Sequence, residues 1–279
     1  MVKEIRRSES PQKGESIRET RDIFNCNYIR SVEKSKIPVC NILGVNIAAV
    51  DMEWTLDYLK KFIKNLSGDY VCVSNVHTTV TSFENPQYCE IQNGGILALP
   101  DGGPLSFVGR KRGHSEMARV TGPSLMGEIF DISVENGYRH YFYGSTEETL
   151  ETMKNKLQTN YPNIQIAGMY SPPFRSITDE EDGVIIKMIN DTNPDYIWIG
   201  LGAPKQEKWM AMHQGKVKGL MIGVGAGFDY YADNIKRAPE WMQRNNLEWL
   251  FRLMQDPKRL FSRYLITNTK FLKLILIGK

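Results

Sequence analysis

An aspartate followed by two glycines is the first feature of the sequence that could do chemistry. The apolar run ILALP leads into Asp101, and Gly102, Gly103 and Pro104 follow it directly. A loop of this kind between a strand and a helix would hold the carboxylate at the carboxyl edge of a parallel sheet, where ligands gather. That position suits a general base with Gly102 beside the substrate. An Asp there can equally cap the next helix, so both roles stay open.

A second apolar run also ends in polar side chains. The segment VCVSNVHTT carries Ser74, Asn75, His77 and Thr78 after its strand-like part. Two strand ends could therefore supply polar groups to one substrate-binding cleft. His77 could titrate near neutral pH, but a single His in the first turn of a helix is more often a capping or packing residue.

Two glycine-bearing segments in the second half of the chain could receive an anionic group. YIWIGLGAP leads into a helix, and helix amino termini accept phosphates. GVGAGFD follows the next strand, where its glycines would let backbone amides approach a ligand. The spacing differs from the G-x-G-x-x-G dinucleotide fingerprint, and glycines that only pack a turn remain the alternative. The candidate ligand contacts are Gly202, Pro204, Gly223, Gly225, Phe228 and Asp229.

Several motifs of known chemistry are missing from the sequence. There is no D-x-D triplet, which commonly holds a metal on a nucleotide-sugar, and no P-loop, G-x-S-x-G elbow or H-E-x-x-H helix. The four cysteines form no C-x-x-C pair. We therefore expect no metal site and no disulfide framework, and a reducing cytoplasm is the natural compartment.

The order of the elements that must position these side chains predicts the fold class. The 279 residues are 41% hydrophobic and 24% charged, as in soluble globular proteins, and a net charge of +3 does not indicate a nucleic-acid partner. From CNILGV, the first expected strand, apolar runs alternate with amphipathic stretches. This pattern predicts an α/β fold with a Rossmann-like, mostly parallel sheet of six or more strands and helices on both faces. The expected divisions are a polar, disordered leader (1–36), a catalytic domain (37–236) and a helical appendage (237–279).

The appendage ends in a basic amphipathic helix. Seven basic residues and one acid lie between Arg252 and Lys279. On a helical wheel most apolar residues of PKRLFSRYLITNTKFLKLILIGK share one broad arc, opposite the cations. Such a helix could lie in the headgroup layer of an anionic membrane or dock on its own domain with a solvated basic face. No run is long enough to span a membrane, and no signal peptide is recognised.

Taken together, these stretches resemble the WecG/TagA/CpsF family of bacterial glycosyltransferases, from about Ile42 to Phe271. The resemblance is carried, in order, by NILGVNI, VSNVHTTV, LPDGGPL, RVTGPSLM, YFYGS, IGLGAPKQEKW, GVGAGFDYYAD, KRAPEWMQRNNLEWLFRL and PKRLFSRY. It implies an inverting, metal-independent enzyme that moves a sugar, often N-acetylmannosamine, from a UDP donor to a polyprenyl-diphosphate-linked saccharide. Such an enzyme would be peripheral on the cytoplasmic face of the plasma membrane and would serve teichoic acid, common antigen or capsule synthesis.

The resemblance also implies roles for individual residues. The base of the family's D-G motif matches Asp101, and the Gln of its P-x-Q-E motif matches Gln206, a contact to donor or acceptor. Asn75 is kept from the T-x-N motif, while Val73 replaces its Thr, so only Ser74 could supply that hydroxyl. The appendage is expected to bring arginines to the active site, where they would neutralise charge on the leaving UDP in place of a metal. The candidates are Arg237, Arg252, Arg259 and Arg263.

Two other functions stay open at this point. The glycine run at 223–227 could belong to a nicotinamide oxidoreductase, although the glycines are misplaced for that fold. A non-catalytic membrane scaffold would keep the fold and use the basic tail to recruit a partner. An exposed apolar tail face could also promote self-association. Neither the donor sugar nor the acceptor saccharide is specified by any motif.

Overall fold

The computed structural model of the protein describes residues 34–278. Apart from residues 34–36, the expected polar leader lies outside the described residues. From Ile37 onward the chain forms one compact unit. The sequence divisions at 37–236 and 237–279 stay predictions.

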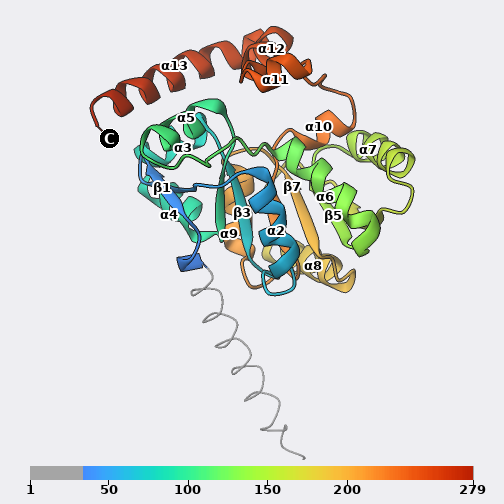
Figure 1. The fold of residues 1–279 in the computed structure, drawn as a ribbon. Helices are drawn as coiled ribbons and strands as arrows, with labels where there is room; N and C mark the ends of the chain where they lie inside the picture. The colour runs from blue at the N-terminus through green and yellow to red at the C-terminus, as the bar shows by residue number, and fades with distance from the viewer. Residues whose placement is uncertain (1–33, 279) are drawn as a thin grey trace, which may run out of the picture. The chain divides into compact units, whose positions relative to one another are not determined.

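A six-stranded parallel sheet forms the centre of this unit (Figure 1). Its strands are β3 (Tyr70–Ser74), β4 (Leu97–Pro100), β5 (Arg139–Gly144), β6 (Gln165–Tyr170), β7 (Tyr196–Gly200) and β8 (Leu220–Gly223). They lie in the order β4-β3-β8-β7-β5-β6, and every neighbouring pair is parallel. The α/β class predicted from the alternating runs is confirmed.

The sheet is covered on both faces because alternate residues of its strands enter two separate apolar cores. In β3, Val71 and Val73 belong to one core and Cys72 to the other. Such a strand is buried throughout and reads as a continuous apolar run. The first core is covered by α2 (Met52–Phe62), α6 (Gly122–Asn136) and α7 (Glu147–Asn160), and the second by α3 (Val76–Glu84), α5 (Gly103–Lys111), α8 (Asp179–Asp191) and α9 (Lys205–His213).

The expected first strand does not join the parallel sheet, and that prediction was wrong. β1 (Val39–Ile42) and β2 (Val45–Ala48) form an antiparallel hairpin of their own. Leu43 and Gly44 connect them with φ angles of 52° and 90°. A two-residue turn with both residues at positive φ joins antiparallel neighbours, whereas a parallel pair needs a long crossover. A further helix, α4 (Pro86–Gly94), packs against β2.

After β8 the described chain is helical, as predicted. The elements are α10 (Gly227–Tyr231), α11 (Glu240–Arg244), α12 (Glu248–Gln255) and α13 (Pro257–Leu276). Pro257 is in the first turn of α13, and the Asp256 side chain accepts a hydrogen bond from the Arg259 backbone N–H, so this helix starts with a side-chain cap.

The last helix docks on the domain and still exposes apolar side chains. Leu260 and Phe271 of α13 are buried, and α13 packs along α3 (Figure 1). Lys270 forms an ion pair with Glu84 at the end of α3. Phe261, Leu265, Ile266, Leu272, Leu276 and Ile277 are more than half exposed. Among the described residues no helix has the length and hydropathy of a membrane span. Docking on the domain and binding to a membrane are therefore compatible roles for α13. Leu260 and Phe271 pack on the domain, while other apolar side chains of the helix face outward.

Candidate active site

Asp101 lies in the loop between β4 and α5, at the carboxyl edge of the sheet. Its backbone N–H donates to the carbonyl of Ser74 over 2.7 Å, which ties the ends of β4 and β3 together. Gly102, with φ of 123°, is the N-cap residue of α5, and no side chain caps that helix. Asp101 is therefore not a helix cap, and its carboxylate is left for another role.

The pKa of Asp101 is raised from its usual 3.8 to about 6. Burial is the largest cause, because it disfavours the charged form. Arg119 lowers this pKa, the charge of Glu248 raises it, and a side-chain hydrogen bond with Asn75 and the charge of Arg252 lower it. A carboxyl with a pKa near 6 is ionised at neutral pH and still basic enough to take a proton, as a general base must be.

Asn75 is fixed by its position at the start of α3. It is the N-cap residue, and its Oδ1 accepts the Thr78 backbone N–H over 3.2 Å. Thr78 completes a capping box, since its hydroxyl accepts the Asn75 backbone N–H over 2.9 Å. Because its oxygen is used in this way, the amide nitrogen of Asn75 remains for the hydrogen bond to Asp101. The N-cap thus orients the side chain next to the candidate base.

His77 also lies at the start of α3, beside the appendage. Burial lowers the pKa of His77, and the charge of Arg263 on α13 lowers it further. Its buried Nδ1 has no hydrogen-bond partner within the described part of the chain. His77 is therefore held neutral at the junction between α3 and α13.

An ion pair joins the loop before α6 to α12, near Asp101. Arg119 Nη2 contacts Glu248 Oε2, and the side chains are only 16% and 14% exposed. Arg119 also donates to the Gln243 carbonyl over 3.4 Å. The β4–α5 loop is in contact with the same region, because a Cβ placed on Gly103 would come within 2.8 Å of the Asn246 side chain. Residues 243–248 therefore lie against Arg119 and against the loop that carries the candidate base.

The four candidate arginines of the appendage have different positions. Arg252 lies at the site: it donates to the Tyr230 hydroxyl over 3.2 Å, stacks on the Tyr230 ring at 5.3 Å, and its charge acts on Asp101. Arg263 acts on His77. Arg259 instead pairs with Asp256 on its own helix. Arg237 is exposed, and its guanidinium donates hydrogen bonds to the side chains of Ser124 and Gln243. The structure thus brings Arg252 to Asp101, whereas Arg237 and Arg259 are engaged elsewhere.

Gln206 connects the two glycine-bearing segments from inside the protein. Its Oε1 accepts the Gly202 N–H over 3.1 Å and the Gly225 N–H over 3.0 Å, and its Nε2 donates to Glu207 Oε1 over 2.9 Å. Gln206 is only 4% exposed. It therefore positions the loops that follow β7 and β8, and a direct contact with a substrate stays a prediction.

Some predicted ligand contacts face the interior instead of the cleft. Ser74 is fully buried and donates to Gln92 Oε1 over 2.5 Å, so its hydroxyl does not replace the one missing from the T-x-N motif. Thr78 is buried in the capping box. Phe228 is 1% exposed and packs on Gly200 and Phe142. Gly223 lies against Gln206. These residues lie at or after a strand end, as predicted, but they are buried.

The remaining candidates lie at partly or fully exposed turns. Gly202 has φ of 75° and Gly225 has φ of 55°, which favours glycine at both. Pro204 is exposed at the start of α9, and Asp229 accepts a hydrogen bond from Asn234 over 3.2 Å. Among residues 34–278 no group of three or more His, Cys, Asp or Glu side chains could hold a metal ion. The expectation of a metal-free reaction stays a prediction.

Sequence reasoning missed the charges that surround Asp101. Arg119 and Glu248 received no role, and neither did Tyr230 or Tyr264, whose pKa is raised mainly by burial and also by the Asp101 charge. Arg119 opens the stretch RVTGPSLM and Glu248 lies in NNLEWLF, so both were within segments that carried the resemblance. Nothing in the sequence pairs these two residues, because Glu248 lies in a segment with another acid and several cations.

Comparison with known proteins shows the family of the chain. Residues 40–279 match the family described as the glycosyl transferase WecG/TagA/CpsF family. The chain belongs to this family. It is similar to an N-acetylglucosaminyldiphosphoundecaprenol N-acetyl-beta-D-mannosaminyltransferase of Bacillus subtilis (strain 168), with 30% identity over 81% of this chain and 90% of the relative. The protein of the same name from Staphylococcus aureus (strain MW2) is 29% identical over 82% and 89%. The chain is therefore a glycosyltransferase of the WecG/TagA/CpsF family.

Proposed function

We propose that the protein transfers a sugar from a UDP donor to a polyprenyl-diphosphate-linked saccharide, with inversion at the anomeric carbon. The observation that carries this proposal is the Asp101 carboxyl, which has a pKa of about 6 and lies beneath the appendage between Arg119 and Arg252. The names of the relatives favour N-acetylmannosamine as the sugar and N-acetylglucosaminyl-diphosphoundecaprenol as the acceptor.

The proposed reaction is a direct displacement. The acceptor hydroxyl attacks the anomeric carbon of the donor, and Asp101 takes the hydroxyl proton as the new glycosidic bond forms. The bond between the anomeric carbon and the UDP oxygen breaks on the opposite side, and UDP leaves with the electron pair. Arg252, with Arg119 once its Glu248 contact is replaced, would neutralise the charge that develops on the leaving diphosphate. This division of work requires no metal.

The proposed location is the cytoplasmic face of the membrane, where the lipid-linked acceptor would be reached from α13. The exposed apolar side chains of α13 and the surrounding cations fit an anionic interface. The UDP moiety would lie at the loops after β7 and β8, which Gln206 holds together by accepting the Gly202 and Gly225 N–H groups.

A calorimetric titration tests the donor. UDP and a panel of UDP-sugars are titrated into the protein seated on anionic vesicles, once with Mg²⁺ and once with a chelator. The proposal expects UDP binding under both conditions and one preferred UDP-sugar. Absence of binding for every UDP ligand, with vesicle association verified, would contradict it and favour the non-catalytic scaffold.

A further inference from the structure

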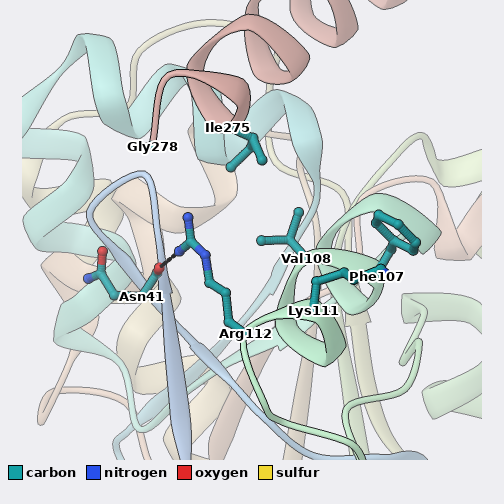
Figure 2. Close-up of a pocket in the computed structure, with 7 residues that line it drawn as sticks. All are labelled: Asn41, Phe107, Val108, Lys111, Arg112, Ile275 and Gly278. Carbon is teal, nitrogen blue, oxygen red and sulfur yellow. Dashed lines mark hydrogen bonds between the residues drawn. The ribbon is translucent and has the colours of Figure 1, made fainter.

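A groove lies at the far end of α5 from Asp101, between this helix, the β1–β2 hairpin and the end of α13 (Figure 2). Its volume is about 550 Å³, within the range of roughly 300–1,000 Å³ that is common for small-ligand pockets. Phe107, Val108 and Ile275 supply apolar surface, and Lys111 and Arg112 add two cations. No acidic side chain is among the seven described residues that line it.

The two cations are presented differently. Arg112 is held in place, since it donates to the Asn41 carbonyl (Figure 2). It also forms a side-chain hydrogen bond with Cys40. Lys111 is exposed, and its ammonium lies 5.7 Å from the centre of the Phe107 ring. Phe107 itself is 54% exposed. The groove thus combines one positioned and one adaptable cation with accessible apolar surface, a combination that suits a phosphate attached to a hydrocarbon chain.

Two helices extend from the candidate active site to this groove. α5 begins directly after the Asp101 loop. At 1.5 Å per residue, Lys111 lies about 12 Å along the helix from Gly103, its first residue. On α13, Tyr264 is influenced by the Asp101 charge, and Ile275 lies about 16 Å farther along that helix. A ligand with one end at Asp101 and the other in the groove would therefore extend along α5 and α13. A sugar ring joined to a diphosphate is of comparable length.

We propose that this groove binds the diphosphate and the first isoprenoid units of the lipid-linked acceptor. This inference rests on the proposed function, because the acceptor hydroxyl must lie at Asp101. The saccharide then occupies the space along α5, the diphosphate contacts Lys111 and Arg112, and the prenyl chain passes over Phe107, Val108 and Ile275. From there the chain continues past Leu276 and Ile277, which are 84% and 62% exposed, towards the bilayer.

The first test compares two acceptors on the full-length enzyme with vesicles present. One carries the saccharide on a long prenyl diphosphate, and the other carries the same saccharide on a short alkyl group without diphosphate. We divide the KM for the prenyl-diphosphate acceptor by the KM for the alkyl acceptor. For Phe107→Ala/Lys111→Ala this ratio is expected to rise about tenfold, the equivalent of 1.4 kcal/mol. The matched control, Phe174→Ala/Lys154→Ala, changes an exposed Phe and an exposed Lys away from the groove and should keep the wild-type ratio.

An unchanged ratio in the groove variant would overturn the proposal. A tenfold loss of affinity for anionic vesicles that carry no acceptor would also overturn it, because the groove would then be a phospholipid site.

The second test needs no turnover. A prenyl diphosphate with a photoreactive group in its first isoprene unit is cross-linked to the wild-type protein, and the modified peptides are mapped.

Cross-links within 39–48, 103–112 or 272–278 support the groove, and cross-links confined to other segments overturn it. Failure of the proposed function would look different. In that case the wild-type protein would transfer no sugar to either acceptor, while the cross-links would still report on the groove.

Discussion

Replacing Asp101 by Asn should stabilise the fold while it removes the base. Burial raises the pKa of this carboxyl from 3.8 to about 6, so the folded state binds the proton more tightly than the unfolded chain does. Above pH 6 the group is ionised in both states. The difference between the two pKa values then corresponds to about 3 kcal/mol by which the ionised carboxylate reduces the free energy of unfolding.

The Asn side chain is uncharged at every pH and keeps nearly the same shape. We expect Asp101→Asn to exceed wild type in unfolding free energy by up to about 3 kcal/mol at pH 8. The difference should shrink as the pH falls through 6 and vanish below about 3.8, where the wild-type carboxyl is protonated in both states. Transfer activity should fall by roughly 10²–10⁴-fold at pH 8, the usual contribution of a general base.

Urea unfolding followed by tryptophan fluorescence at pH 8 and at the lowest pH where wild type is folded measures the stability difference, and initial transfer rates measure activity. Asp57→Asn, at an exposed position of α2, is the matched control and should change stability by less than about 0.5 kcal/mol. A variant as active as wild type, or one less stable than wild type at pH 8, would refute the assignment of Asp101 as a base with a raised pKa.

Two further substitutions test the contact between the appendage and the site. Glu248→Gln removes a charge that raises the pKa of the base and releases Arg119, so the acidic limb of the pH–rate profile should move to lower pH; a limb that stays in place would show that Glu248 does not act on the base. Gly103→Ala places a Cβ within 2.8 Å of Asn246 and should destabilise the docked appendage by about 1–3 kcal/mol, measured as faster proteolysis of the appendage. Gly183→Ala is its control. Gly183 lies within α8, and a Cβ added there would contact no other atom, so this substitution should instead stabilise the protein by about 0.5–1 kcal/mol.

The parallel sheet could be predicted because each of its strands is a short apolar run followed by an amphipathic stretch. The hairpin at the start of the domain could not, since NILGV reads as one strand unless Leu43 and Gly44 are recognised as a turn with positive φ. The spacing of apolar residues along a sequence indicates which residues are buried. Which strand pairs with which depends here on the conformation of two turn residues.

The site shows the same division between local and long-range information. Asp101 and Asn75 were found because each directly follows a strand, and the carboxyl ends of parallel strands share one edge. The pairing of Arg119 with Glu248 joins residues 129 positions apart and depends on how the appendage docks. Ser74 and Phe228 were assigned to the cleft because they lie at or after a strand end, but the Ser74 hydroxyl donates to Gln92 in the interior and the Phe228 ring, on α10, packs on Phe142.

The most direct test of the account is transfer by the wild-type protein itself. The preferred UDP-sugar and N-acetylglucosaminyl-diphosphoundecaprenol are incubated with the full-length protein on anionic vesicles in the presence of a chelator, and the product is examined by NMR. The account predicts a glycosidic bond to the acceptor saccharide with the anomeric configuration opposite to that of the donor. A product that retains the donor configuration, or transfer that appears only when a divalent metal is restored, would contradict a single displacement assisted by Asp101 and the arginines.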